Sequence, residues 1–273
     1  MTVPPGRTTI VTSLQNERVK LIRSLEMRKA RKQTGLFVAE GASVLISARE
    51  AGWTPRMLVC RSGAAEGIAK GLIEWALKAD AEVLEVSDAV LGKIAAKDNP
   101  QSLIGVFAQR WSEPPPAGAV PTSATWLALE EVRDPGNLGT IVRTVDAVGG
   151  AGILLVGSCC DPFAHECVRA TMGSIFTVAL TRMTRDAFLA WRSGWPGEVV
   201  GTHLSASDDF RAVRYRAPAL LVMGGEGPGL SPELTAACDR LVKIPMAGRL
   251  DSLNLAVATA LTLYQIRGSE LRL

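Results

Sequence analysis

The chain has 273 residues, 47% of them hydrophobic, which is enough to bury the cores of two ordinary domains without disulfide or metal staples. The formal net charge is only +3, so overall charge alone does not indicate a nucleic-acid partner. The apolar runs are far shorter than a membrane span, and residues 1–13 lack the continuous apolar stretch of a signal peptide. We therefore expect no membrane association.

The cysteines and histidines argue against disulfides and against a metal site. The five cysteines are odd in number and form no C-x-x-C pair, which favours reduced thiols in a cytoplasmic protein. The two histidines, His165 and His203, do not stand at ligand spacing, so we predict no metal and expect both to be ordinary surface or core residues.

The first part of the chain alternates predicted helices and strands, as a small α/β domain does. A basic helix is expected over 16–32, where seven Lys and Arg residues between 18 and 32 face one acid, Glu26. This pattern fits either a solvated helix face or a helix that faces phosphates. Strands are predicted near 36–39, 57–60, 82–86 and 103–108, and helices near 42–51, 64–79 and 89–95.

A segment rich in Pro, Ala, Ser and Gly separates this part from the rest of the chain. It covers residues 111–125 and contains four prolines that stiffen it. We therefore predict a first domain over 1–110, a linker over 111–125 and a second domain over 126–273.

The second part predicts a mostly parallel sheet with helices on both faces. Strands are expected near 126–132, 153–157, 175–179, 199–204, 219–223 and 241–245, and the last helix near 253–267. Because that helix is apolar almost all round, the pattern predicts that it is buried.

Three segments of the second part place polar or glycine residues where a predicted strand ends. They are residues 126–144 (WLALEEVRDPGNLGTIVRT), 220–232 (LLVMGGEGPGLSP) and 242–263 (VKIPMAGRLDSLNLAVATALTL). Open α/β sheets bind ligands at the carboxyl ends of their strands, so we expect these loops to form one site.

The glycine loop of the second segment admits several interpretations. A Rossmann loop needs glycine, and a P-loop needs lysine, where Leu230 stands. The glycine loop of a class I methyltransferase would follow the first strand and would have an acid where Met223 stands. Here too little chain follows the loop to form the rest of such a sheet. A plain helix-entry loop stays open, as does helix capping for Ser252 and Asn254.

Together the three segments, over residues 122–270, resemble the motifs of the SpoU/TrmH family of RNA ribose 2′-O-methyltransferases in the SPOUT superfamily. The resemblance implies a C-terminal α/β domain whose parallel sheet carries a trefoil knot, S-adenosylmethionine as cofactor, and a homodimer. Residues 13–20 and 37–41 are similar to the start of the ribosomal-protein-like α/β/α substrate-binding domain of rRNA-modifying members, which minimal tRNA-modifying members lack. Large-subunit (23S) rRNA is therefore the expected substrate. The alternatives are tRNA, a catalytically silent RNA-binding protein and a small-molecule methyltransferase.

The resemblance also implies roles for individual residues. Those expected to be catalytic are Asn137, Arg143, Glu226, Ser252 and Asn254. Those expected to contact the cofactor are Gly224, Ile244 and Leu253, with Met246, Gly248 and Ser252 close by.

Elementary chemistry constrains some of these roles. A guanidinium pKa above about 12 makes Arg143 a poor base, so we expect it to hold the ribose and its 3′ phosphate while Ser252 hydrogen-bonds the hydroxyl. Asn137 and Asn254 are expected to fix loop geometry, and Glu226 to bond loop amides or to position Arg143. Arg169, in a segment that is also similar to the family, is either a phosphate contact or part of a structural ion pair.

Overall fold

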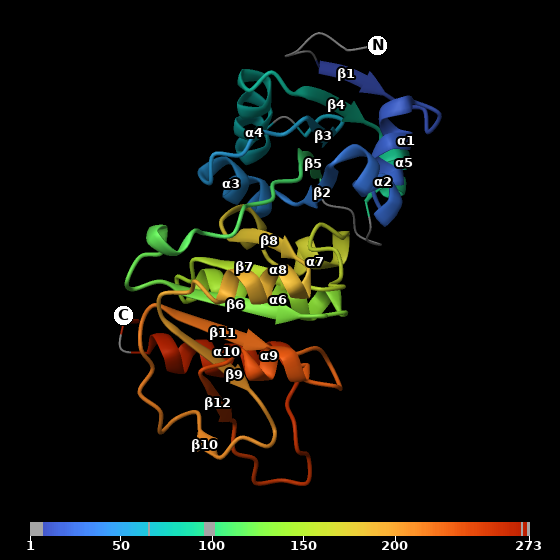
Figure 1. Ribbon diagram of the computed structural model, residues 1–273. Coiled ribbons are helices and arrows are strands. Elements are labelled where there is room, and N and C mark those ends of the chain that lie inside the picture. Colours follow the sequence, from blue (N-terminus) through green and yellow to red (C-terminus); the bar gives the residue numbers. More distant parts are fainter. Residues whose placement is uncertain (1–7, 65, 96–101, 269, 272–273) are drawn as a thin grey trace. The chain divides into compact units, whose positions relative to one another are not determined.

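The computed structural model describes residues 8–64, 66–95, 102–268 and 270–271, and these form two compact units (Figure 1). The first unit consists of the chain up to Gln109 together with Asp161–Thr177. The second consists of Arg110–Cys160 and the chain from Val178 onward. Within the described part of the chain, no helix is both long enough and apolar enough to cross a bilayer.

The first unit is a five-stranded sheet covered on both faces. Its strand order is β1-β4-β3-β5-β2, and β5 runs antiparallel to both of its neighbours. The strands are β1 (Thr8–Val11), β2 (Leu36–Glu40), β3 (Met57–Arg61), β4 (Glu82–Val86) and β5 (Leu103–Ala108). Helices α1 (Glu17–Ser24) and α5 (Asp88–Ile94) cover one face, and α3 (Ala42–Glu50) and α4 (Gly67–Lys78) cover the other.

The single basic helix expected over 16–32 is wrong. Helix α1 ends at Ser24, and a second helix, α2 (Arg28–Thr34), begins after an extended residue, Met27. The reason lies in the side chain of Arg31, whose Nη1 donates to the carbonyls of Leu25 at 2.8 Å and Glu26 at 2.7 Å. These carbonyls would bond helix amides in an unbroken helix, and here a guanidinium takes that place.

The segment Asp161–Thr177 supplies part of the core of the first unit. Phe163, which precedes helix α7 (His165–Ala170), and Phe176, in the 3₁₀ turn η2 (Ser174–Phe176), join a cluster whose neighbouring ring centroids lie 4.8 to 6.4 Å apart. The cluster consists of Phe37, Trp53, Phe107, Phe163 and Phe176. The strand predicted near 175–179 is therefore wrong, because Phe176 packs as part of a turn and the strand begins at Ala179.

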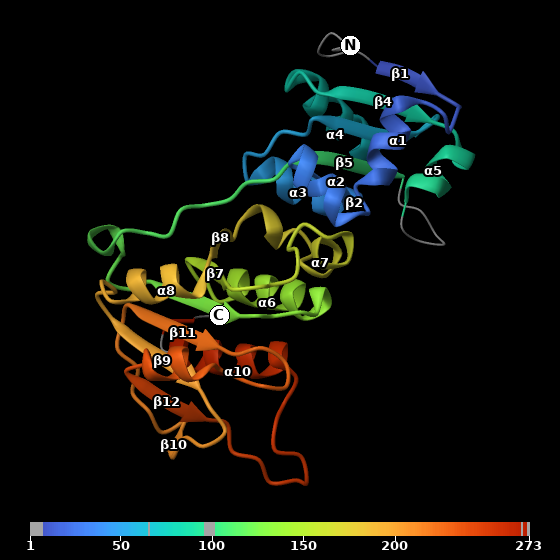
Figure 2. The ribbon, with the colours of Figure 1, turned by 45° about the vertical axis from the view of Figure 1, so that its right-hand side comes forward.

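The second unit confirms the predicted parallel sheet. Its seven strands are all parallel, in the order β10-β12-β9-β11-β6-β7-β8. They are β6 (Thr125–Glu130), β7 (Gly152–Val156), β8 (Ala179–Met183), β9 (Glu198–Thr202), β10 (Asp208–Asp209), β11 (Ala219–Met223) and β12 (Arg240–Lys243). Helices α6 (Pro135–Ala147) and α10 (Leu255–Arg267) cover one face, and α8 (Arg185–Arg192) and α9 (Pro232–Ala236) cover the other (Figure 2). The trefoil knot stays a prediction.

The proline-rich segment over 111–125 is attached to the second unit at several points. The Ser112 amide donates to the carbonyl of Leu180 at 2.8 Å, and the Trp191 ring nitrogen donates to the carbonyl of Pro115 at 2.8 Å. The guanidinium of Arg182 stacks 3.6 Å from the ring centre of Trp111. The segment is therefore held against β8 and α8.

Helix α10 is not buried all round, so that prediction is wrong. Leu255, Ala256 and Leu263 are buried, because one side of the helix packs against α6 and β11. Three large side chains spaced at i, i+4 and i+7 remain exposed, namely Val257 (48%), Leu261 (42%) and Tyr264 (50%). We call them the α10 stripe.

Candidate functional site

The first motif turns sharply between β6 and α6. The strand ends at Glu130, Glu131 adopts a left-handed backbone with φ of 50°, and Pro135 opens the helix. Asp134 caps that helix by accepting from the Asn137 amide at 2.6 Å, and proline suits the first helical position. Asn137 therefore stands in the first helical turn with its side chain free to reach the neighbouring loops.

A buried acid that the sequence did not single out supports these loops from below. Glu130 is 3% exposed, and its Oε1 accepts from Nε of Arg185 at 3.0 Å. Its Oε2 accepts from the amide of Ser231 at 2.8 Å, at the far end of the glycine loop. A buried carboxylate with both oxygens bonded is satisfied, so Glu130 fixes the end of β6 to the start of α9.

The glycine loop is compact because its glycines are sterically required. A Cβ on Gly224 would lie 2.0 Å from the backbone of Gly229, so no other residue fits there. Gly225 and Gly229 pair across the loop, and Gly227 and Gly229 have φ of 96° and 73°, values that favour glycine. This folding brings Glu226 out toward the first motif.

Asn137 joins the three motifs through both ends of its amide. Its Nδ2 donates to Oε1 of Glu226 at 3.0 Å, and its Oδ1 accepts from Nδ2 of Asn254 at 2.9 Å. The other carboxylate oxygen of Glu226 accepts from the Arg133 amide at 3.2 Å. We call this chain, Glu226–Asn137–Asn254, the amide bridge. Of the two roles expected for Glu226, the contacts match the bonding of loop groups rather than the positioning of Arg143.

The bridge keeps Glu226 ionised. Partial burial raises the pKa of this carboxyl, but hydrogen bonds from Asn137 and from the backbone amides of Arg133, Glu226 and Asp134 outweigh that effect. The net pKa therefore lies below its ordinary value, and the carboxylate is an acceptor at neutral pH.

Asn254 is also the N-cap of α10. Its Oδ1 accepts from the amides of Ala256 at 2.9 Å and Val257 at 3.3 Å, so the capping interpretation is confirmed for this residue. Ser252 does not cap the helix, because its hydroxyl donates to Oδ1 of Asp251 at 3.1 Å.

A cavity of about 530 Å³ opens beside the bridge at the carboxyl ends of β9, β11 and β12. Of the residues expected to contact a cofactor, five line it: Gly224, Ile244, Met246, Ser252 and Leu253. Glu226 and Asn254 also line it, whereas Gly248, Asn137 and Arg143 do not belong to the lining. Arg143 is exposed on α6, and its side chain forms no hydrogen bond or ion pair with any residue that the structure describes.

Several lining residues escaped the sequence analysis. Thr202 ends β9, His203 and Leu204 follow it, and Asp251 precedes Ser252. The strand predicted at 199–204 carried the necessary signal, because its carboxyl end shares an edge with those of β11 and β12. Its order in the sheet could not be read from the sequence.

Arg169, the remaining candidate, lies exposed in α7 of the first unit and makes no ion pair with a described residue. In the parts of the chain that the structure covers, no three His, Cys, Asp or Glu side chains are grouped to hold a metal. Burial raises the pKa of Cys159 to about 11 and of Cys160, under the first motif, to about 12.

A parallel sheet whose carboxyl-end loops surround a cofactor-sized cavity defines a cofactor-dependent α/β enzyme. Residues 124–264, just over half of the chain, match the SpoU rRNA Methylase family, and residues 16–105 match the MRM3-like substrate binding domain. The chain belongs to the SpoU rRNA methylase family and is an RNA methyltransferase.

Relatives match both units. An uncharacterised tRNA/rRNA methyltransferase of Synechocystis sp. is 30% identical over 95% of this chain and 94% of its own length. The 23S rRNA guanosine 2′-O-methyltransferase RlmP of Bacillus subtilis is 25% identical over 94% of this chain and 99% of its own. The crystal structure of an AdoMet-bound rRNA methyltransferase from Sinorhizobium meliloti is 42% identical, covers 97% of this chain and 99% of its own, and superposes with a TM-score of 0.90.

Proposed function

We propose that the protein methylates the 2′-hydroxyl of a ribose in large-subunit (23S) rRNA, with S-adenosylmethionine as methyl donor. The names of two relatives support this target, RlmP and a 23S rRNA uridine 2′-O-methyltransferase of Streptomyces viridochromogenes that is 28% identical over 87% of this chain. The AdoMet-bound relative from Sinorhizobium meliloti supports the cofactor. Because these relatives match both units, rRNA is favoured over tRNA.

The amide bridge is the observation that carries the proposal. It holds three loops at the mouth of one cavity, and its members Glu226 and Asn254 lie 89 and 117 residues from Asn137 in sequence. The cavity volume of about 530 Å³ falls in the range of small-molecule sites. Met223, Ile244 and Leu253 offer apolar walls and the glycine loop offers backbone groups, so the residues present fit a nucleoside cofactor.

Bound S-adenosylmethionine supplies a methyl group on a sulfonium whose departing thioether is neutral, so we expect no metal to take part. The task left to the protein is to align the ribose hydroxyl and accept its proton. Ser252 suits this task, because its own proton points to Asp251 and its oxygen lone pairs remain open to accept from the 2′-hydroxyl. We assign the proton, leaving late through Ser252, to the carboxylate of Asp251.

Arg143 is assigned to the phosphate on the 3′ side of the target ribose. Its exposed guanidinium has no partner among the described side chains. Arg143→Lys keeps the charge and loses the planar fork, so we expect at least about a tenfold loss of RNA methylation with unchanged cofactor binding. A variant as fast as wild type would contradict this role.

The α10 stripe supports the proposal of a homodimer. Val257, Leu261 and Tyr264 form an exposed apolar stripe on a helix that begins at the bridge residue Asn254. A second copy related by a two-fold axis would cover this stripe with its own. We also place the reaction in the cytoplasm, where the five thiols stay reduced.

The test is methylation of protein-free rRNA and of isolated large ribosomal subunits with a labelled methyl donor, followed by mapping of the modified ribose. Calorimetry with S-adenosylmethionine runs in parallel. Label at a 2′-hydroxyl of 23S rRNA is the expected result. Cofactor binding without label on either substrate would refute the rRNA assignment, as would label found only on tRNA offered as a third substrate. A protein that binds rRNA and no cofactor would be a silent RNA-binding member.

A further inference from the structure

The positive charge of the protein belongs to its first unit. That unit, residues 1–109 with 161–177, contains 16 Lys and Arg against 13 Asp and Glu, whereas the second unit contains 14 of each kind. The whole net charge of +3 therefore comes from the first unit, and the segment 18–32, with seven cations and one acid, more than accounts for it.

Three of those seven cations have acidic partners. Arg31 is buried, and its Nε donates to Oδ2 of Asp161 at 2.8 Å. Arg18 pairs with Glu82 at 3.0 Å, and Lys20 pairs with Glu17 at 2.8 Å. These ion pairs neutralise their cations within the unit, so the three residues are poor candidates for contact with a polyanion.

The other four cations are exposed on the two helices. Arg28, Lys29 and Lys32 lie on one side of α2, and Arg23 stands in the last turn of α1, across the turn that Arg31 holds. We call these four residues the α1–α2 basic face. All four are exposed, and none of their side chains forms a hydrogen bond or ion pair with a residue inside the described ranges.

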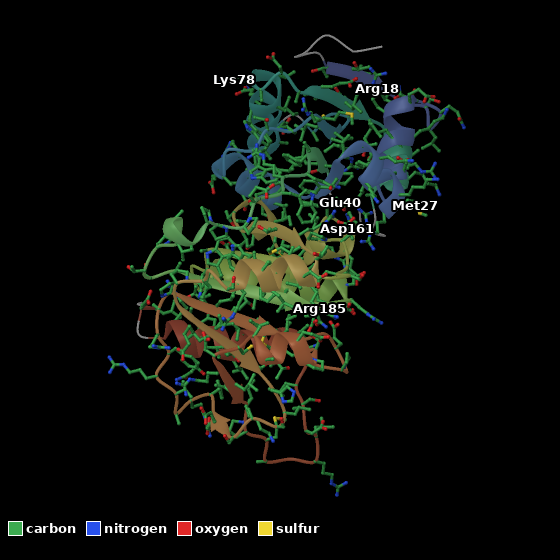
Figure 3. All side chains as sticks on the ribbon, viewed as in Figure 1. Arg18, Met27, Glu40, Lys78, Asp161 and Arg185 are labelled. Carbon is green, nitrogen blue, oxygen red and sulfur yellow. The ribbon has the colours of Figure 1, made fainter. Side chains whose placement is uncertain are left out.

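The turn between the helices adds an apolar contact to this face. Met27 is 67% exposed at that turn, and Figure 3 shows it at the outer side of α1 and α2, away from Lys78 on α4. A mixture of unpaired cations and an exposed apolar side chain suits a ligand with both phosphates and flat apolar groups.

Three other exposed cations of this unit have acids beside them. Arg61 pairs with Asp88 at 2.6 Å. Lys70 lies four residues from both Glu66 and Glu74, and Lys78 lies four residues after Glu74, which are neighbouring positions along a helix. Compared with these three positions, the α1–α2 basic face has fewer acids beside it, with only Glu26 in the turn.

We propose that the α1–α2 basic face binds phosphates of the RNA substrate and anchors it, while Arg31 stays inside the protein and only presents the face. The identity of the ligand as RNA rests on the proposed function. The contacts are electrostatic and carry no sequence information, so they supply affinity and leave the choice of nucleotide to other contacts.

The experiment measures binding of the full-length protein to purified 23S rRNA over a series of salt concentrations. Each phosphate that the protein ceases to neutralise lowers the slope of log affinity against log salt by about 0.7 to 0.9. The variant Arg28→Ala/Lys29→Ala/Lys32→Ala should therefore reduce that slope by roughly 2 to 3, and lower affinity at least about tenfold at about 100 mM salt. In methylation kinetics, KM should rise while kcat at saturating RNA stays near wild type.

The matched control removes the same charge elsewhere in the unit, as Arg61→Ala/Lys70→Ala/Lys78→Ala, and should leave the slope near that of wild type. The charge-preserving variant Arg28→Lys/Lys29→Arg/Lys32→Arg should bind as wild type does. Equal slopes for the wild type and the α2 triple variant would overturn the proposal. The proposal would also be overturned if the control variant reduced the slope as much as the α2 variant does. A third contrary result would be that the α2 variant loses binding to phosphatidylserine vesicles while its binding to 23S rRNA is unchanged. Because binding is read without methyl transfer, this result is independent of whether the protein methylates rRNA.

Discussion

The buried ion pair between Arg31 and Asp161 gives a sharp test of how the first unit is held together. The two side chains are 5% and 7% exposed and lie 130 residues apart in sequence. Asp161→Ala removes the anion and leaves the guanidinium buried, with two backbone carbonyls as its remaining acceptors. It also removes the acceptor for the Phe163 amide, which Asp161→Asn would keep.

The expected cost is large because a buried charge that loses its partner is not rescued by solvent. Removing one member of a buried pair destabilises by about 3–5 kcal/mol, against a total stability of about 5–15 kcal/mol for a domain. Hydrogen exchange of amides in β2 and β5 should therefore accelerate by roughly two to three and a half orders of magnitude, at about 1.36 kcal/mol per tenfold. Asp161→Asn should cost less, since it still bonds the Phe163 amide.

Hydrogen-exchange mass spectrometry reports amide exchange in the two units separately, and peptides from β6 and β11 of the second unit serve as the internal reference. The control is Arg61→Gln, which breaks an exposed pair of the same unit and should leave exchange unchanged. The double variant Arg31→Met/Asp161→Ala should recover part of the stability, because no charge is then left unpaired. If amides of β2 and β5 in Asp161→Ala exchange as slowly as in wild type, the buried guanidinium of Arg31 does not depend on Asp161 for its stability, which contradicts the prediction.

Acidification tests the role of Glu226, whose pKa is lowered in the folded state. The stabilisation that its carboxylate provides is therefore complete above the ordinary pKa of 4.5, and it is lost as pH falls through the lower pKa of the folded state. The difference in melting temperature between wild type and Glu226→Gln should be constant above about pH 5.5 and shrink below about pH 4, and a difference that grows on acidification would contradict the bridge. Burial raises the pKa of Cys159 to about 11 and of Cys160 and Cys238 to about 12, so at about pH 8 iodoacetamide should label these thiols only after unfolding, as read by mass spectrometry. Leu261→Glu/Tyr264→Glu should convert a dimer to a monomer in light scattering, whereas Thr140→Glu, on the exposed side of α6, serves as a probe of how far the interface extends. Asn254→Asp keeps a good N-cap and loses the donor to Asn137, so it should lower methylation roughly tenfold at nearly unchanged melting temperature. If the melting temperature falls together with the methylation rate, Asn254 acts only as the cap of the helix.

The sequence predicted the second unit well because its signals are local. Strands of a parallel sheet buried on both faces appear as short apolar runs, and β6, β7, β9, β11 and β12 were found that way. The turn chemistry of the three motifs is also local, since proline at a helix start, glycines in a tight loop and asparagine at an N-cap each leave a recognisable pattern.

Features that depend on distant partners were missed. In the sequence, Arg31 cannot be told from the other cations of the basic segment, because the acid with which it forms its buried ion pair, Asp161, lies 130 residues away. Phe176 was placed in a strand, because its aromatic partners Phe37 and Phe107 lie far from it in sequence. The short edge strands β1 and β10 carry too few apolar residues to be recognised.

The amide bridge shows why the site needs asparagine at two positions where a cap or a turn alone would accept several residues. The chain of hydrogen bonds has a direction: the backbone amides of α10 can only donate, and the carboxylate of Glu226 can only accept. Between them, Asn254 and Asn137 must each accept on one side and donate on the other, which aspartate cannot do at neutral pH. Because the two ends fix the orientation of both amides, the cap of α10 also sets the position of the glycine loop. The three motifs are thus coupled, and a change in one of them should be felt at the cavity that all three border.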